Sequence, residues 1–292
     1  MTLLGSCAAI IVAPARVSGE SNLPLPYRIF APAVVRSDPP DYSVESLESL
    51  ISAWRVPRCE LKSQALPCEQ SGISYGISPA TGAWAQGAEG SAILFSLYNG
   101  PSYGNVMFAR TLFDNATQEA ASSARIYTLN LRFKYSPETT ANNHGGLSRL
   151  EQLEFAIHIR RQIQGSFRVA NFELAYTNVF GNPSENQKWS ISAGDEFAWS
   201  NVFDAARLTA ETWHEISVRV EIIPGRIVDS MHYISATIDG ETHKIDRYYT
   251  PVAESFFATS SISTHVQLDG SVATPSLGGF EVAVDQVNIS AD

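Results

Sequence analysis

The chain has little cysteine, an excess of acidic over basic residues, and no long apolar run, and each shortage excludes a class of protein. Cysteine accounts for three of the 292 residues, and no second Cys or His pair completes a zinc-ligand pattern with Cys59 and Cys68. Asp and Glu (30) outnumber Lys and Arg (20), which gives a formal net charge of −10. An acidic protein repels phosphate backbones, so we expect no nucleic-acid partner. Because no apolar run has the roughly 20 residues of a membrane-spanning helix, we expect no transmembrane segment.

The first residues have the composition of an export segment. The chain is apolar from Leu3 to Val12, and Ala13-Pro14-Ala15 resembles a small-residue cleavage site. Basic residues before the apolar run, which are usual in signal peptides, are missing, so an apolar first strand is the alternative. We expect residues 1–18 to be a signal segment and the protein to be secreted.

The next part of the chain predicts a lead-in with one short helix. Residues 19–42 are rich in Pro, Ser and Asp, a composition typical of extended chain. A helix is predicted over 43–54, because apolar residues recur there at helical spacing. The prediction is therefore a lead-in over 19–69 followed by a single domain over 70–292.

Cys59 and Cys68 lie close together within this lead-in. A disulfide closing so short a loop stabilises a fold by about 2–3 kcal/mol in the chain-entropy model. The alternative is a pair of free, partly buried thiols. The sequence leaves both open.

Beyond about residue 90 the pattern is one of short strands. Apolar and polar side chains alternate along 126–135, 153–160 and 214–222, as they do in strands with one buried and one solvated face. Further strands are predicted at 92–98, 106–113, 167–176, 233–239 and 279–289. With turn signals between the strands and almost no helix, the chain is predicted to be all-β. We expect two antiparallel sheets in a jelly-roll sandwich, preceded by the short N-terminal helix.

Four segments near the C-terminus resemble strands of concanavalin A-like lectin and glucanase domains. They are Trp213-His214-Glu215-Ile216-Ser217-Val218, Tyr233–Gly240 with its Asp-Gly turn, His265–Gly270 and Phe280–Val287. Together they cover about residues 210–290. The resemblance implies a jelly-roll fold and a secreted, carbohydrate-active class, and it leaves the specific activity open.

Cationic side chains fall on the solvated faces of three predicted strands: Arg132, Lys134, His158, Arg160 and Arg219. If these strands are neighbours in one sheet, the side chains form a cationic patch. Such a patch suits an acidic polysaccharide, because Arg binds carboxylates bidentately. The alternative is a solvated face on which the cations pair with neighbouring glutamates.

A polysaccharide lyase is the main enzymatic alternative. The resemblance to jelly-roll lyases implies an Arg and an amide to neutralise a uronate, with a His and a Tyr for proton transfer. Arg132, Asn130, His158 and Tyr233 are the nearest set here. Ala156 stands where the alginate lyase motif has Gln. The Glu-x-Asp-x-x-Glu run of retaining glycosidases on this fold is missing, so a lyase is favoured over a glycoside hydrolase.

Aromatic and acidic residues supply the remaining candidates. Tyr176, Trp189 and Trp199 either form stacking platforms for sugar rings or fill the end of the sandwich. Asp285, in the middle of a predicted strand, is a candidate ligand of a structural calcium ion. We expect an extracellular protein that binds a glycan, and the alternatives are a polysaccharide lyase and a structural subunit of an extracellular assembly.

Overall fold

The computed structural model describes residues 42–44, 51–61, 66–81, 85–87, 92–98, 104–112, 121–136, 150–163, 166–177, 187–192, 199–203, 207–225, 229–254, 260–270 and 279–292. All of them belong to the compact unit Pro39–Asp292. The signal segment predicted over 1–18 and most of the predicted lead-in lie outside the described residues. Within the described part of the chain, no helix has the length and apolar character needed to cross a membrane.

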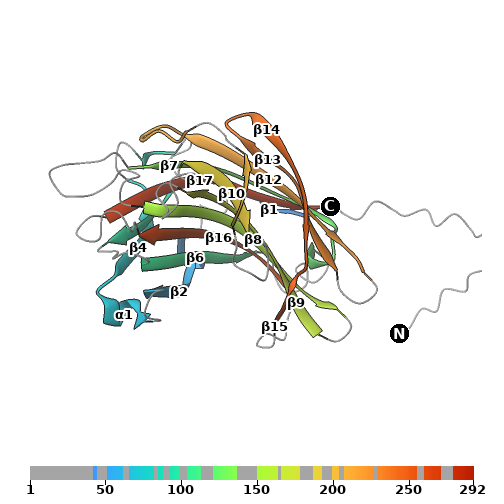
Figure 1. Ribbon diagram of the computed structural model, residues 1–292. Helices are drawn as coiled ribbons and strands as arrows, with labels where there is room; N and C mark the ends of the chain where they lie inside the picture. The colour runs from blue at the N-terminus through green and yellow to red at the C-terminus, as the bar shows by residue number, and fades with distance from the viewer. Residues whose placement is uncertain are drawn as a thin grey trace, which may run out of the picture. The chain divides into compact units, whose positions relative to one another are not determined.

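The described strands form two antiparallel sheets (Figure 1). The eight-stranded sheet contains, in spatial order, β14 (Glu241–Tyr249), β13 (Ser230–Ile238), β12 (His214–Ile223), β7 (Ile126–Tyr135), β17 (Gly279–Ala291), β5 (Ile93–Tyr98) and β4 (Ser74–Pro79), with β1 (Tyr42–Val44) beside β17. The nine-stranded sheet contains β11 (Trp199–Phe203), β10 (Lys188–Ser192), β9 (Ser166–Thr177), β8 (Leu150–Ile163), β16 (Ser261–Gly270), β6 (Gly104–Leu112), β2 (Arg55–Leu61) and β3 (Leu66–Pro67), with β15 (Val252–Glu254) beside β9. The predicted all-β sandwich is confirmed.

The core lies between the two sheets and follows the predicted alternation. The apolar side chains of β7 and β8 are buried: Tyr127, Leu129, Leu131, Phe133, Leu153, Phe155, Ile157 and Ile159. Phe133 from one sheet meets Phe155 from the other, with ring centroids 4.8 Å apart. Burying a side chain of this size contributes roughly 1.5–3 kcal/mol. The pairing of apolar faces therefore holds the sheets together.

The predicted N-terminal helix is wrong for the part of 43–54 that the structure describes. Tyr42–Val44 is a strand that pairs with the end of β17, and Ile51–Ala53 forms a single 3-10 turn. The residues between them lie outside the described part. Trp54 is buried edge-on against Phe95, with ring centroids 4.9 Å apart. Trp54 is therefore buried because it packs against the sheet, and its burial does not require a long helix.

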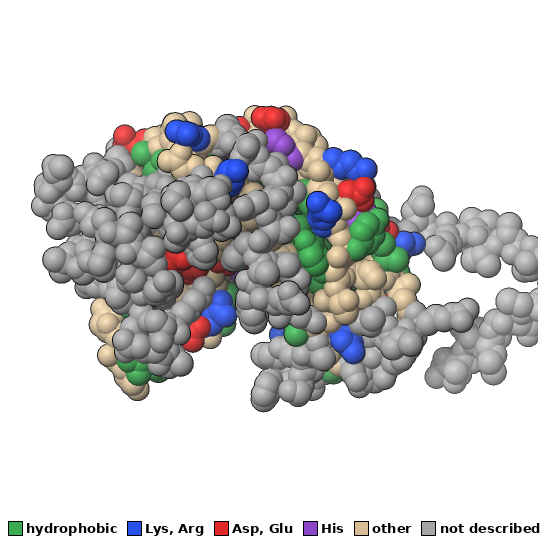
Figure 2. Space-filling model, in the orientation of Figure 1, with side chains coloured by type: hydrophobic (Ala, Val, Ile, Leu, Met, Phe, Trp, Pro, Cys, Tyr) green, Lys and Arg blue, Asp and Glu red, His purple; other side chains and the backbone are tan. Residues whose placement is uncertain are grey.

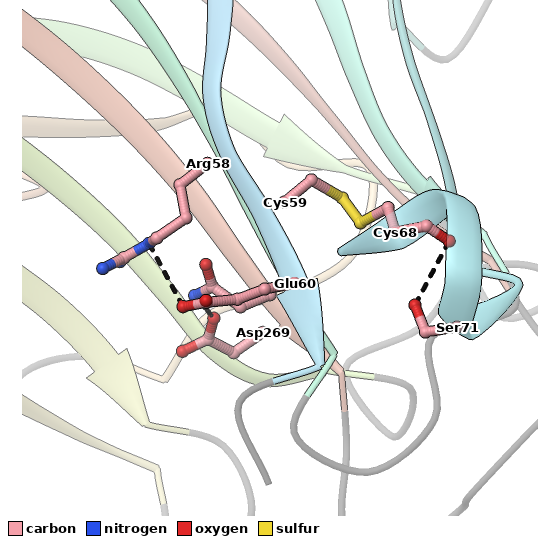
Figure 3. The surroundings of a disulfide bond; sticks show 7 residues. Arg58, Cys59, Glu60, Cys68, Ser71 and Asp269 are labelled. Atoms are coloured by element: carbon pink, nitrogen blue, oxygen red, sulfur yellow. Dashed lines mark hydrogen bonds and ion pairs between the residues drawn. A yellow bond between two sulfur atoms is a disulfide. The ribbon is translucent and has the colours of Figure 1, made fainter. Parts of the chain in front are cut away.

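The sandwich also begins earlier than residue 70. Strand β2 pairs with β6 inside the nine-stranded sheet. The Cys59–Cys68 disulfide, with 5.4 Å between its Cα atoms, ties β2 to the start of the short helix α1 (Cys68–Ser71). Figure 3 shows Cys59 on one side of β2, and Arg58 and Glu60 on the other. The disulfide is therefore the alternative that forms, and it leaves the neighbouring polar side chains facing away from it.

Candidate functional site

Neighbouring strands of the nine-stranded sheet bring polar side chains into register on the face that points away from the core. Because side chains alternate along each strand, every second residue of β9, β8, β16, β6 and β2 lies on this outer face. We call the following set the polar face: Arg58, Glu60, Asn105, Gln152, Glu154, His158, Asn171, Glu173, His265, Gln267 and Asp269. Figure 2 shows acidic and basic side chains close together where Figure 1 draws β16, β6 and β2.

Most members of the polar face are withdrawn from solvent. Asn105, Gln152, Glu154, His265, Gln267 and Asp269 are buried. Polar side chains that point away from the core of a sandwich are usually solvated, and their burial is tolerated only when they have hydrogen-bond partners. The hydrogen-bond partners of these side chains therefore determine which of their polar groups could bind a ligand.

Two histidines from adjacent strands stack at the centre of the polar face. The rings of His158 and His265 have centroids 3.7 Å apart. His158 Nε2 lies 3.3 Å from Glu173 Oε1, and His265 Nε2 lies 2.8 Å from Ser263 Oγ. Ala156 of β8 pairs with His265 on one side and with Glu173 on the other. Its small side chain leaves room between these two larger side chains.

The environment assigns different charge states to this cluster. Burial, and then the positive charges of His158, Arg58 and Arg160, hold the pKa of His265 well below its ordinary 6.5. Burial alone would raise the pKa of Glu173, but hydrogen bonding to His158 and the charge of that ring outweigh it and lower the pKa. Near neutral pH the cluster therefore presents a neutral imidazole at His265 and a carboxylate at Glu173.

A second group lies toward β2. Arg58 Nη2 donates a 2.7 Å hydrogen bond to Gln267 Oε1, and Arg58 Nε is 3.8 Å from Glu60 Oε1. Asn105 Nδ2 donates to Asp269 Oδ1. Figure 3 shows Arg58, Glu60 and Asp269 on the same side of β2. The group offers a guanidinium, two amides and carboxylates within one small area.

Four buried polar atoms on this face have no hydrogen-bond partner among the described residues: Arg58 Nε, Asn105 Oδ1, Asn171 Oδ1 and Ser190 Oγ. Ser190, on β10, joins the outer face because it pairs with Ala175 of β9. Leaving such an atom unsatisfied costs about 1–3 kcal/mol. One donor, two acceptors and a hydroxyl match a ligand whose hydroxyl groups both donate and accept.

Tyr233 supports the polar face from inside the sandwich. Its side chain extends from β13 of the other sheet and is fully buried. The backbone N–H of Glu173 donates a 2.8 Å hydrogen bond to its hydroxyl oxygen, and the hydroxyl lies 3.3 Å from the carbonyl oxygen of Asn171. Burial raises the pKa of Tyr233 well above 10. Tyr233 thus satisfies the β9 backbone between the segments paired with β10 and β15.

The cationic patch predicted from the sequence is divided between the two sheets. Arg132, Lys134 and Arg219 lie on neighbouring strands of the eight-stranded sheet, whereas His158 and Arg160 lie on β8 of the nine-stranded sheet. Arg160 Nη1 donates a 3.0 Å hydrogen bond to Ser261 Oγ. The five cations therefore do not form one surface.

The candidate lyase set is divided in the same way. Asn130 and Arg132 lie on the outer face of β7, His158 lies on the polar face, and Tyr233 is buried between the sheets. Only His158 lies on the polar face itself, with Tyr233 directly beneath it. The structure does not bring the four side chains together in one groove.

The predicted aromatic platforms lie mostly in the core. Tyr176 and Trp189 are 1% and 0% exposed and pack edge to face with centroids 5.3 Å apart. They fill the space between the sheets, which is the alternative that the sequence left open. Trp199 belongs to β11, and its side chain lies outside the described part.

Asp285, the candidate calcium ligand, is buried on the eight-stranded sheet. Its Oδ2 lies 3.8 Å from Arg132 Nη1. A Cβ added at Gly87 would come within 3.0 Å of the carboxyl group, so Gly87 allows the backbone to approach Asp285 closely. The calcium ion stays a prediction.

Several members of the polar face were not among the sequence candidates: Arg58, Asn105, Asn171, Glu173, His265 and Gln267. The sequence does contain a pattern that points to His265 and Gln267. Together with Asp269, these polar residues alternate with the apolar Val266 and Leu268 along β16. A search for polar residues on the alternate positions of that strand would have found them.

Comparisons with known proteins add similarities of fold. No protein-family model matches the chain, and no curated protein matches it. A double mutant of the alginate lyase Aly36B, in complex with an alginate trisaccharide, is similar with a TM-score of 0.44 at 9% identity over 86% of this chain and 98% of that chain. The PL-14 alginate lyase from Aplysia kurodai has a TM-score of 0.41 at 10% identity, over 75% and 87%. Basic winged bean lectin with Tn-antigen has a TM-score of 0.40 at 8% identity, over 86% and 98%. The likeness concerns the fold alone.

Proposed function

We propose that this chain binds an extracellular glycan across the polar face. The observation that supports it best is the set of unpaired buried atoms at Arg58, Asn105, Asn171 and Ser190. Sugar hydroxyls both donate and accept hydrogen bonds, so a glycan bound on this face could supply partners of the missing kind once these side chains turn toward it. The Cys59–Cys68 disulfide supports an extracellular location, because disulfides persist mainly in oxidising compartments.

The charge of the polar face favours a neutral glycan. Four of its members are acidic: Glu60, Glu154, Glu173 and Asp269. Against them stand two arginines on the same outer face, Arg58 and Arg160, and two histidines of which His265 is neutral near pH 7. Carboxylates accept hydrogen bonds from sugar hydroxyls, whereas they repel a polymer of uronates. A neutral glycan is therefore favoured over the acidic polysaccharide expected from the sequence.

A glycan array that contains neutral and acidic polysaccharides tests this function. We expect binding to neutral glycans, and little change in affinity between low and high salt, because no net charge is neutralised. Gln267→Ala is expected to weaken that binding, and Arg247→Ala, an exposed residue at the edge of the other sheet, to leave it unchanged. An array without any bound glycan would refute the proposal.

One observation favours a second candidate, a polysaccharide lyase. His158 and His265 stack with ring centroids 3.7 Å apart on the same outer face as Arg58, so two imidazoles that could take part in proton transfer lie on the face that also carries a guanidinium. In β-elimination the base would take the C5 proton of a uronate, the C4–O bond would break, and the C4–C5 double bond would form, with the leaving oxygen taking up a proton. Incubation with alginate, polyglucuronate and pectin tests this. Ultraviolet absorbance of an unsaturated product would support a lyase, and its absence on all three would end that candidate.

A further inference from the structure

The eight-stranded sheet has a separate polar hollow on its own outer face. Its volume is about 220 Å³, and it lies where β7, β12, β13 and β17 meet. The side chains that line it include three amides and two hydroxyls: Asn130, Gln286, Asn288, Ser217 and Thr237. None of these residues belongs to the polar face.

A β-bulge in β17 forms one wall of this hollow. The pairing of β17 with β7 shifts register between Asp285 and Asn288, and Gln286 within the bulge has φ of 53°. A residue other than glycine in this left-handed region costs of order 1–3 kcal/mol. Bulges often re-aim a side chain beside a functional site. Here the strained residue, Gln286, is one of the three that contribute an amide to the hollow.

Arg132 forms another wall and carries a donor with no partner. Its guanidinium carbon lies 4.8 Å from the centroid of the Trp213 ring, and its ion-pair contacts to Glu215 and Asp285 are both 3.8 Å. Arg132 Nε is buried and has no hydrogen-bond partner among the described residues. The contact with Trp213 restrains the guanidinium of Arg132, which is one of the residues that line the hollow.

We propose that this hollow is a second saccharide site, which takes one neutral pyranose residue. A hollow of about 220 Å³ suits a single sugar ring better than an oligosaccharide. The amides and hydroxyls offer both donors and acceptors to ring hydroxyls. Arg132 already has two acidic neighbours, Glu215 and Asp285, so the hollow has no surplus positive charge that would select an anion. This site does not depend on the function proposed for the polar face.

Nuclear magnetic resonance on the isotopically labelled full chain tests the proposal directly. The side-chain NH₂ signals of Asn130, Gln286 and Asn288 are followed while methyl α-mannoside, methyl β-glucoside or methyl β-galactoside is added. We expect saturable shifts of these signals with at least one of the three glycosides. No shift with any of them would overturn the proposal, and so would a shift with sodium acetate alone.

Two matched variants locate the response. Ser217→Tyr fills the hollow and is expected to abolish the shifts, whereas Ser235→Tyr, on the same face of the adjacent strand β13, is expected to keep them. If Ser217→Tyr fails to fold, Gln286→Gly removes the amide at a φ that glycine adopts freely, and a loss of affinity of about tenfold is expected. Shifts that persist in the folded hollow variant would refute the site. Gln267→Ala is expected to leave the shifts unchanged, which separates this site from the polar face.

Discussion

Replacing Tyr233 with phenylalanine removes one oxygen atom from the interior of the sandwich. The ring would keep its edge-to-face contacts with Phe172 and Tyr249, whose centroids lie 5.1 and 5.9 Å away. The backbone N–H of Glu173 and the carbonyl of Asn171 would lose the hydroxyl that lies 2.8 and 3.3 Å from them. Because the N–H is then buried without a partner, we expect the free energy of unfolding to fall by about 1–3 kcal/mol.

Urea denaturation followed by intrinsic fluorescence measures this change. The midpoint of Tyr233→Phe is expected to fall while the slope with denaturant stays constant, because the surface exposed on unfolding is the same. Tyr248→Phe is the matched control, since Tyr248 is 56% exposed and exposed substitutions usually stay within about 0.5 kcal/mol. If both variants are as stable as the parent protein, Tyr233 does not hold the β9 backbone as described.

Three further predictions concern buried charge and the disulfide. Because the pKa of His265 is lowered in the folded protein, the unfolded chain binds more protons below about pH 6.5, and the free energy of unfolding falls by up to about 1.4 kcal/mol per pH unit as the pH is lowered. Urea titrations at neutral and mildly acidic pH should show a smaller loss of stability for His265→Gln than for the parent protein. An equal loss in both would contradict the burial argument. Cys68→Ser opens the short loop closed with Cys59 and should lower stability by about 2–3 kcal/mol, with no further effect of a reductant on the variant. Arg161 and Asp229 form an ion pair in a little-exposed site. Asp229→Ala leaves Arg161 without a counter-charge and should lower the free energy of unfolding by about 3–5 kcal/mol. The double replacement Arg161→Met with Asp229→Leu should lower it less.

The strands of this protein are largely predictable because alternation reports the two faces of each strand. The segment 126–135 alternates between buried and more exposed side chains almost residue by residue. Strand β2 escapes prediction for a physical reason: Pro57 lies within it, and a register shift between Arg55 and Arg58 accommodates the ring. A proline inside a run of residues argues against a strand in the sequence, even though the structure tolerates it at a bulge.

The candidate site is harder to predict because alternation does not tell which sheet a strand joins. Arg132 and His158 both occupy the polar positions of their strands, but β7 pairs with β12 and β17, whereas β8 pairs with β9 and β16. Apart from the β8–β9 hairpin, those pairings join segments far apart in the chain, and no local pattern encodes them. The polar face and the hollow therefore become visible only once the sheets are assembled.

The central claim, that the polar face binds a glycan, is tested most directly by calorimetric titration of a neutral glycan identified on the array. Arg58→Ala removes a side chain that contacts Gln267 and Glu60, and Arg247→Ala removes an exposed arginine from the other sheet. We predict that Arg58→Ala lowers the affinity at least about tenfold, which is about 1.4 kcal/mol, and that Arg247→Ala leaves it unchanged. Equal affinity of the parent protein and folded Arg58→Ala would contradict the account.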